Sequence, residues 1–261
     1  MAEARADATP GGDAHATLLA QAAVAIVLIV AWESAGRAFG HAWTSLPSLI
    51  AVRLGEWAAS GLARHAAVTL FEITGGLALG ASTGIVLGLV LGRTVTLSVV
   101  LRPFIVGLYS VPIVTLAPLL ILWFGLDMMP KIVLVALSTF FLLFFNTFAG
   151  VQAIDRDLVE ALRIMGASPR EEFARVILPG AVAWIVSGLK IAVPYAFAAA
   201  VTGELLAARD GIGSLLAAAA AQFDMTGLYA ALVVLMALGT LASALATRAE
   251  RWLLRWRPAA Q

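Results

Sequence analysis

The sequence contains no cysteine, so disulfide bonds and thiolate metal sites are excluded. Charge is also scarce, because only 13% of the 261 residues are charged and the net charge is +1. A chain with so few cations cannot neutralise a series of phosphates, which argues against binding to nucleic acid. His15, His41 and His65 are scattered, and no side chains are grouped as a metal site or as a nucleophile with its base.

Lysine occurs only at positions 131 and 190, and neither residue follows a glycine-rich loop of the kind that binds phosphates. A chain without that loop cannot hydrolyse ATP in the manner of a P-loop ATPase. We therefore predict that the chain is not an enzyme, has no catalytic or metal site and holds no cofactor of its own. If ATP drives it, another polypeptide must supply the hydrolysis.

Hydrophobic residues are abundant and make up 61% of the chain, whereas soluble domains are closer to half apolar. Crossing the hydrocarbon core of a bilayer takes about 20 apolar residues in a helix. The sequence therefore predicts an all-α polytopic protein that lies in the lipid bilayer and has six transmembrane helices. They are expected at residues 17–39, 73–92, 103–126, 132–154, 179–203 and 225–247.

The segments outside the spans are more polar. Eleven of the 17 lysines and arginines lie on the same side as the N-terminus, five lie on the other side, and Lys190 lies inside a span. Because cytoplasmic segments are enriched in positive charge, both termini are predicted to be cytoplasmic. We expect a disordered tail at 1–16, an external amphipathic segment at 40–65, a core of five spans at 66–250 with a cytoplasmic loop at 155–178, and a basic tail at 251–261.

The loop at 155–178 is a charged, amphipathic island between two apolar spans. Residues 157–165 are expected to form a short helix that ends at Gly166, because glycine adopts the left-handed conformation that stops helices. Ser168 is a good N-cap for a second helix, Pro169 suits its first turn, and Glu171 completes a capping box. Two capped helices joined by a short turn predict a rigid elbow.

The spacing of residues 160–179 resembles the EAA loop of bacterial ABC-importer permeases, which docks into a groove on a separate ATPase subunit. That loop reads Glu-Ala-Ala, three residues, Gly, nine residues, then Ile-x-Leu-Pro. Here Val176 takes the Ile position, and Leu162 departs from the second Ala. An ordinary amphipathic loop is the alternative, but the spacing favours coupling to an ATPase. The resemblance assigns this role to Glu160, Ala161, Arg163, Gly166, Ala167, Ser168, Pro169, Phe173, Leu178 and Pro179.

The resemblance implies a type I, MetI-like permease fold, most similar to the nitrate/sulfonate/taurine group. The Leu-Trp-Phe-Gly sequence at 122–125, the loop at 211–215 and the tail with Glu250, Arg251 and Trp256 support that group. It implies a bacterial inner-membrane subunit present twice, with two ATPases that bind ATP and Mg²⁺, and a periplasmic or lipid-anchored substrate-binding protein. The expected cargo is a sulfonate, taurine or nitrate. The alternatives are a heterocyclic or aromatic nutrient and, less favoured, an ATP-independent secondary transporter.

Glycine recurs every fourth residue at Gly76, Gly80, Gly84 and Gly88, which places these residues on one helix face. Small residues let transmembrane helices approach closely, so this face is expected to pack against another helix. The sequence leaves open whether that helix belongs to the same chain or to a second copy.

The span at 103–126 is rich in proline and is expected to be a kinked helix. Such helices often line transport paths, although a kink that serves packing alone is an equal alternative. Lys190 is expected near mid-membrane, where a charge usually faces a cavity or a partner, and Glu72 and Glu204 are its candidate partners. The predicted path residues are Ser110, Pro112, Thr115, Pro118, Lys190 and Glu204.

Overall fold

The computed structural model describes residues 10–40, 44–207 and 209–255, and every regular element within them is a helix. This confirms the prediction of an all-α chain. By length and composition, five helices can cross a membrane, and a sixth crossing is formed if the bent pair α4–α5 is one span. The elements are α1 (Pro10–Phe39), α2 (Pro47–Ser60), α3 (Leu62–Arg93), α4 (Val95–Tyr109), η1 (Ile113–Leu116), α5 (Ala117–Phe124), α6 (Met128–Gln152), α7 (Arg156–Ile164), α8 (Pro169–Glu172), η2 (Phe173–Ile177), α9 (Leu178–Ala207), α10 (Ile212–Ala221) and α11 (Met225–Leu253).

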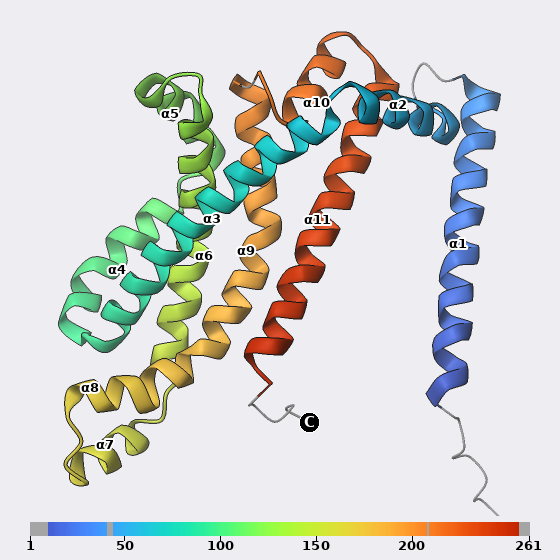
Figure 1. Cartoon of the computed structure of the whole chain (residues 1–261). Helices are drawn as coiled ribbons and strands as arrows, with labels where there is room; N and C mark the ends of the chain where they lie inside the picture. The colour runs from blue at the N-terminus through green and yellow to red at the C-terminus, as the bar shows by residue number, and fades with distance from the viewer. Residues whose placement is uncertain (1–9, 41–43, 208, 256–261) are drawn as a thin grey trace, which may run out of the picture.

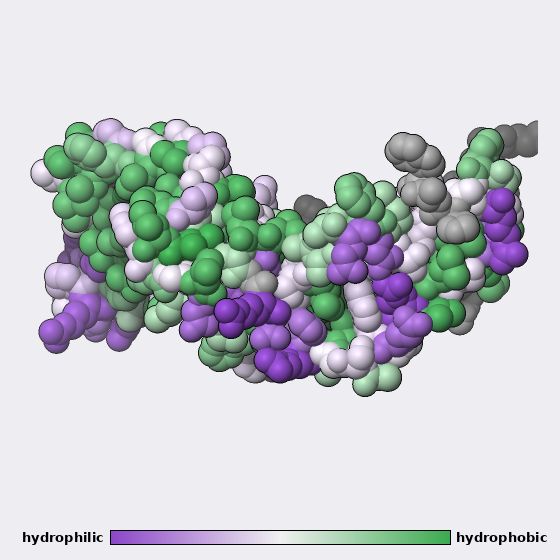
Figure 2. Space-filling view, turned by 90° about the horizontal axis from the view of Figure 1, so that it is seen from above, coloured by the Kyte–Doolittle hydropathy of each residue, from purple (hydrophilic) through white to green (hydrophobic). Residues whose placement is uncertain are grey.

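The long helices run between two ends of the molecule (Figure 1). The start of α1, the short helices α7 and α8, and the end of α11 lie at one end, which we call the elbow end. Helices α2, α5 and α10 lie at the other end, which we call the far end. Seen from the far end, hydrophobic residues cover the side of α4 and α5, whereas hydrophilic residues gather towards the middle and the side of α2 (Figure 2).

Helix α6 packs against α3 and against α9, and these three helices form the centre of the fold. Gly76, Gly80, Gly84 and Gly88 are buried on α3. A Cβ atom at any of them would overlap atoms of α6, for example the side chain of Thr139 at Gly80. The glycines therefore allow the backbones of α3 and α6 to approach closely, within one chain.

Helix α1 stands apart from this centre (Figure 1) and exposes apolar side chains such as Val27. It contacts α2, and the ring of Trp32 lies 5.4 Å from that of Tyr229 on α11. The helix begins at Pro10, so residues 10–16, expected in the disordered tail, are helical. Proline suits a first helical turn, and Ala14 and Ala16 favour helix, although Gly11 and Gly12 do not. Residues 1–9 of that tail lie outside the described residues.

The expected kinked helix at 103–126 is instead two helices separated by a 3₁₀ turn, and the two are bent by 81°. Helix α4 ends at Tyr109, just before Pro112, and Pro118 stands in the first turn of α5. Proline lacks the N–H that would continue a helix and clashes with the preceding turn, so Pro112 stops α4. Pro103 lies within α4 without ending it.

Candidate functional site

The elbow, residues 155–178, is built as its local sequence predicts. The Asp155 carboxylate accepts a hydrogen bond from the N–H of Asp157 (2.9 Å) and caps the start of α7. The helix stops before Gly166, whose φ of +83° lies in the left-handed region. The N–H of Gly166 donates to the carbonyl of Arg163 (2.9 Å), and that of Ala167 donates to Leu162 (3.0 Å). These bonds satisfy the last carbonyls of α7 and fix its turn towards α8.

The second half of the elbow begins with the expected capping box. The Ser168 hydroxyl accepts from the N–H of Glu171, and the Glu171 carboxylate accepts from the N–H of Ser168 (2.9 Å). From Pro169 the chain remains helical through a π-helical turn at Phe173–Ile177 and into α9. Leu178 and Pro179 are half-buried in the first turn of α9. The elbow is therefore continuous with a membrane helix.

A bidentate ion pair ties the two elbow helices together. Arg163 on α7 donates to the two carboxylate oxygens of Glu172 on α8 over 2.8 and 3.1 Å. The hydrogen bonds with Glu172 raise the pKa of the Arg163 guanidinium. The Glu172 side chain is only 5% exposed, although it lies in a charged loop. The sequence-based prediction did not include Glu172 among the elbow residues, because its pairing with Arg163 depends on the turn that brings α7 and α8 together.

The elbow is anchored on one side and exposes apolar side chains on the other. Phe173 packs against a small cluster with Val151 and Ile177, and the guanidinium of Arg93 lies 4.9 Å from the centre of its ring. At the tip, Ile164 and Met165 are 87% and 81% exposed. Exposed apolar side chains at the tip of a polar loop suit a contact with another protein. Glu160, Ala161, Ser168 and Pro169 are exposed around this tip.

A cavity of about 230 Å³ lies where the break between α4 and α5 meets α6 and α9. The polar groups of its lining are Ser138, Tyr195 and Thr202, none of which the sequence reading selected. Residues 195, 198, 199 and 202 share one face of α9 at helical spacing, and this pattern could have identified them. The complete lining is Ile113, Val114, Leu134, Ser138, Tyr195, Ala198, Ala199 and Thr202.

The polar path residues expected around the proline-rich break do not line this cavity. Ser110 and Thr115 are exposed. Their hydroxyls donate hydrogen bonds to the backbone carbonyls of Val106 (2.9 Å) and Pro112 (2.6 Å), within the same turns of the chain. Pro112 and Pro118 are also exposed, so they shape the break rather than the cavity surface. The apolar residues Ile113 and Val114, which lie between Pro112 and Thr115, line the cavity instead.

Lys190 pairs with Glu250 on α11 (2.9 Å) and not with Glu72 or Glu204, which corrects the expected partner. Its side chain is 45% exposed and does not line the cavity. The end of α11 lies beside α9 at the elbow end, and the linear sequence does not reveal this neighbour.

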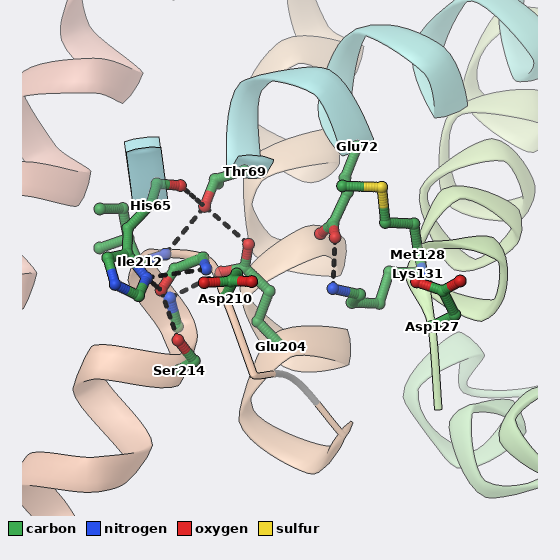
Figure 3. A network of polar contacts seen from close by, with 12 residues as sticks. His65, Thr69, Glu72, Asp127, Met128, Lys131, Glu204, Asp210, Ile212 and Ser214 are labelled. Carbon is green, nitrogen blue, oxygen red and sulfur yellow. Dashed lines mark hydrogen bonds and ion pairs between the residues drawn. The ribbon is translucent and has the colours of Figure 1, made fainter. Parts of the chain in front are cut away.

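Glu204, which was predicted in the translocation path, is buried in a polar network at the far end (Figure 3). Its carboxylate accepts from the Thr69 hydroxyl (2.6 Å) and from the N–H of Gly213 (2.6 Å). Gly211, with φ +116°, lies against the carboxylate, where a Cβ would overlap it. The N–H of Ile212 donates to Thr69 (2.9 Å), so the network joins α3, α9 and the start of α10.

An ion pair between Glu72 on α3 and Lys131 on α6 lies close to this network (Figure 3). Both side chains are buried, although Lys131 precedes the span predicted at 132–154. The carboxyl group of Glu72 also interacts with that of Glu204, which links the ion pair to the network. The pair therefore holds α3 and α6 together at the far end.

Comparisons with known proteins agree with this geometry. The family model described as "Binding-protein-dependent transport system inner membrane component" matches residues 84–255. The chain is 34% identical over 234 residues to the formylaminopyrimidine transport permease protein ThiX of Halalkalibacterium halodurans, an alignment that covers 89% of this chain and 93% of that protein. It is 32% identical over 235 residues to the putative aliphatic sulfonates transport permease protein SsuC of Bacillus subtilis, which covers 88% and 85%.

Among solved structures, a chain of the MetNI methionine ABC transporter, described as inward facing, superposes with a TM-score of 0.57 at 21% identity. The match covers 71% of this chain and 90% of that chain, which confirms the MetI-like fold. The chain belongs to the family of binding-protein-dependent transport system inner membrane components, and it is a permease subunit of an ABC importer.

Proposed function

We propose that this chain forms the translocation path of an ATP-driven importer, and that its elbow transmits the movement of a separate ATPase to that path. The observation that carries the proposal is the unbroken helix from Pro169 to Ala207. Its first turn belongs to the elbow, and Tyr195 and Thr202 on the same helix line the cavity. At 1.5 Å per residue, about 40 Å separate Pro169 from Tyr195. A displacement of the elbow would therefore tilt the cavity wall.

The proposed assembly contains two copies of this permease in the bacterial inner membrane. Two ATPases, with ATP and Mg²⁺, dock at the elbow end in the cytoplasm, where both termini also lie. The excess of arginine in the segments at this end supports that orientation. A periplasmic or lipid-anchored binding protein delivers the substrate at the far end. ATP binding and hydrolysis then alternate the access of the path between the two sides.

For the cargo, we propose a small organic compound, either a sulfonate such as taurine or a heterocyclic nutrient. The names of the two relatives support these two chemistries, one each. The cavity offers three hydroxyl groups and a tyrosine ring, and no charged residue lines it. This lining favours the heterocyclic compound over nitrate or a sulfonate. Calorimetric titration of the cognate binding protein with taurine, an alkanesulfonate, nitrate and formylaminopyrimidine would decide between them.

Replacement of Gly166 with proline tests the elbow directly. Proline holds φ near −65°, whereas Gly166 needs +83°, and proline removes the N–H that Gly166 donates to Arg163. We expect α7 and α8 to lose their relative orientation and substrate uptake to fall at least about ten-fold, a change of about 1.4 kcal/mol in coupling. Uptake and ATP hydrolysis would be measured together on the complete transporter in proteoliposomes.

Gly61→Pro is the matched control. Gly61 also has a left-handed φ (+114°) and donates its N–H to Trp57, but it lies at the far end between α2 and α3. The control strains the backbone in the same way, and the amount of substrate moved per ATP hydrolysed should stay close to wild type. Wild-type coupling in Gly166→Pro would contradict the role of the elbow.

A further inference from the structure

A second cavity, of about 400 Å³, lies between the elbow and the ends of α3 and α6. Three arginines, Arg93, Arg156 and Arg163, and two glutamates, Glu160 and Glu172, contribute its charged lining. Its charged lining distinguishes it from the cavity beside the α4–α5 break, whose lining has no charged residue. A lining rich in arginine suits an anion with several oxygen atoms.

Two of these arginines remain available for a ligand. Both oxygens of Glu172 are engaged by Arg163, so this pair is already neutralised. Within the described part of the chain, Arg93 and Arg156 form no ion pair and donate no side-chain hydrogen bond. Arg93 stacks on the ring of Phe173 and attracts the Glu172 carboxylate from beyond ion-pair distance. With three arginines against two glutamates, the cavity wall keeps an excess of positive charge.

An apolar groove of about 450 Å³ also has Arg93 in its lining. It is lined by Val86, Leu89, Val90, Thr94, Phe173 and Arg93 itself. Val86, Leu89 and Val90 lie three and four residues apart, on one face of the membrane-spanning helix α3. Val86 and Val90 are 57% and 43% exposed. An arginine-lined cavity and an apolar groove thus share Arg93 at the elbow end of a membrane helix.

We propose that an anionic phospholipid of the leaflet at the elbow end occupies both spaces. Its phosphate contacts Arg93 and Arg156, and one acyl chain lies in the groove of Val86, Leu89 and Val90. Basic pockets between membrane helices on this side of a bilayer are suited to anionic headgroups. A soluble anion would fill the cavity but leave the groove empty, and a segment of the ATPase would not need a groove that faces the membrane.

The lipid would touch both halves of the coupling machinery. Arg93 belongs to α3 and stacks on Phe173, which continues the elbow helix into α9. Arg156 opens α7. A phosphate bound between them would hold the elbow against α3. The lipid site does not depend on the identity of the cargo.

The test uses the complete transporter in neutral nanodiscs, with phosphatidylglycerol titrated against a phosphatidylcholine background and bound lipid counted by native mass spectrometry. For the double variant Arg93→Gln/Arg156→Gln we expect about 25-fold weaker binding, from about five-fold for each arginine. Arg93→Lys/Arg156→Lys keeps both charges and should retain most of the binding. Arg251→Gln, which removes an exposed charge at the end of α11 near the same membrane surface, should bind like wild type.

Val90→Trp separates a lipid from a soluble anion, because it fills the groove and leaves both arginines in place. We expect phosphatidylglycerol binding to fall in this variant, and inorganic phosphate not to displace the lipid from wild type. Unchanged lipid binding in Arg93→Gln/Arg156→Gln would overturn the proposal. Displacement of phosphatidylglycerol from wild type by inorganic phosphate, together with normal lipid binding to Val90→Trp, would also overturn it. Lipid binding that occurs only after the ATPase is removed would overturn it as well.

Discussion

Lys131→Met is expected to destabilise the folded chain by about 3–5 kcal/mol. The side chains of Lys131 and Glu72 are only 6% and 0% exposed. The substitution therefore leaves the carboxylate of Glu72 buried without its cation. The carboxyl group of Glu204 lies close to that of Glu72 and adds a second acidic group, so the loss of the cation is not offset there. Methionine keeps most of the side-chain length, so packing against Gly203 should change little. Thermal unfolding of the purified chain in detergent measures the effect.

Two further variants separate the buried charge from other causes. Glu72→Leu combined with Lys131→Met removes both charges and should recover most of the lost stability. Arg64→Met breaks the exposed pair with Asp210 at the same end and should cost less than about 1 kcal/mol. If Lys131→Met unfolds at the wild-type temperature, or the double variant is no more stable than the single one, the ion pair does not hold α3 to α6.

Gly80→Leu is expected to cost at least about 3 kcal/mol, the upper part of the range for overpacking a core. Any Cβ at this position overlaps the Thr139 side chain and the carbonyl of Ala136 on α6. A backbone carbonyl cannot rotate away as a flexible side chain can, so α3 would have to move from α6. The yield of monodisperse protein in size-exclusion chromatography and the unfolding temperature should both fall.

Gly107→Leu is the matched control for that variant. Gly107 lies within α4, and no atom lies within 4 Å of the position of its Cβ. The same side chain there meets no neighbour in this chain, and replacing a helical glycine usually stabilises a helix by about 0.5–1 kcal/mol. Equal losses in the two variants would mean that a leucine in any membrane helix is harmful and that the glycine row has no special packing role.

The sequence predicted the elbow well because its signals are local. The stop at Gly166 and the capping box of Ser168 and Glu171 each depend on residues within one or two turns. The positions of the spans were predictable for a similar reason, since apolar composition over about 20 residues suffices. The break in the proline-rich segment was underestimated, because a proline can kink a helix or end it and the sequence does not say which.

Pairings between distant helices could not be predicted. Lys190 and Glu250 are 60 residues apart, and Glu204 and Thr69 are 135 apart. For Lys190 the sequence offered two candidate partners, Glu72 and Glu204, and the composition does not show which helices are neighbours. The glycines at 211 and 213 matched a family pattern, but only the structure shows that they make room for the Glu204 carboxylate.

The most direct test of the central claim is to identify what the elbow tip touches. Because the chain has no cysteine, Met165→Cys carries a single reactive thiol at the tip, where Met165 is 81% exposed. A photo-activated cross-linker on that thiol should capture the ATPase subunit of the complete transporter in membranes. The same reagent on Ala59→Cys, which is exposed on α2 at the far end, should not capture it. Capture of the ATPase from Ala59→Cys and not from Met165→Cys would contradict the account.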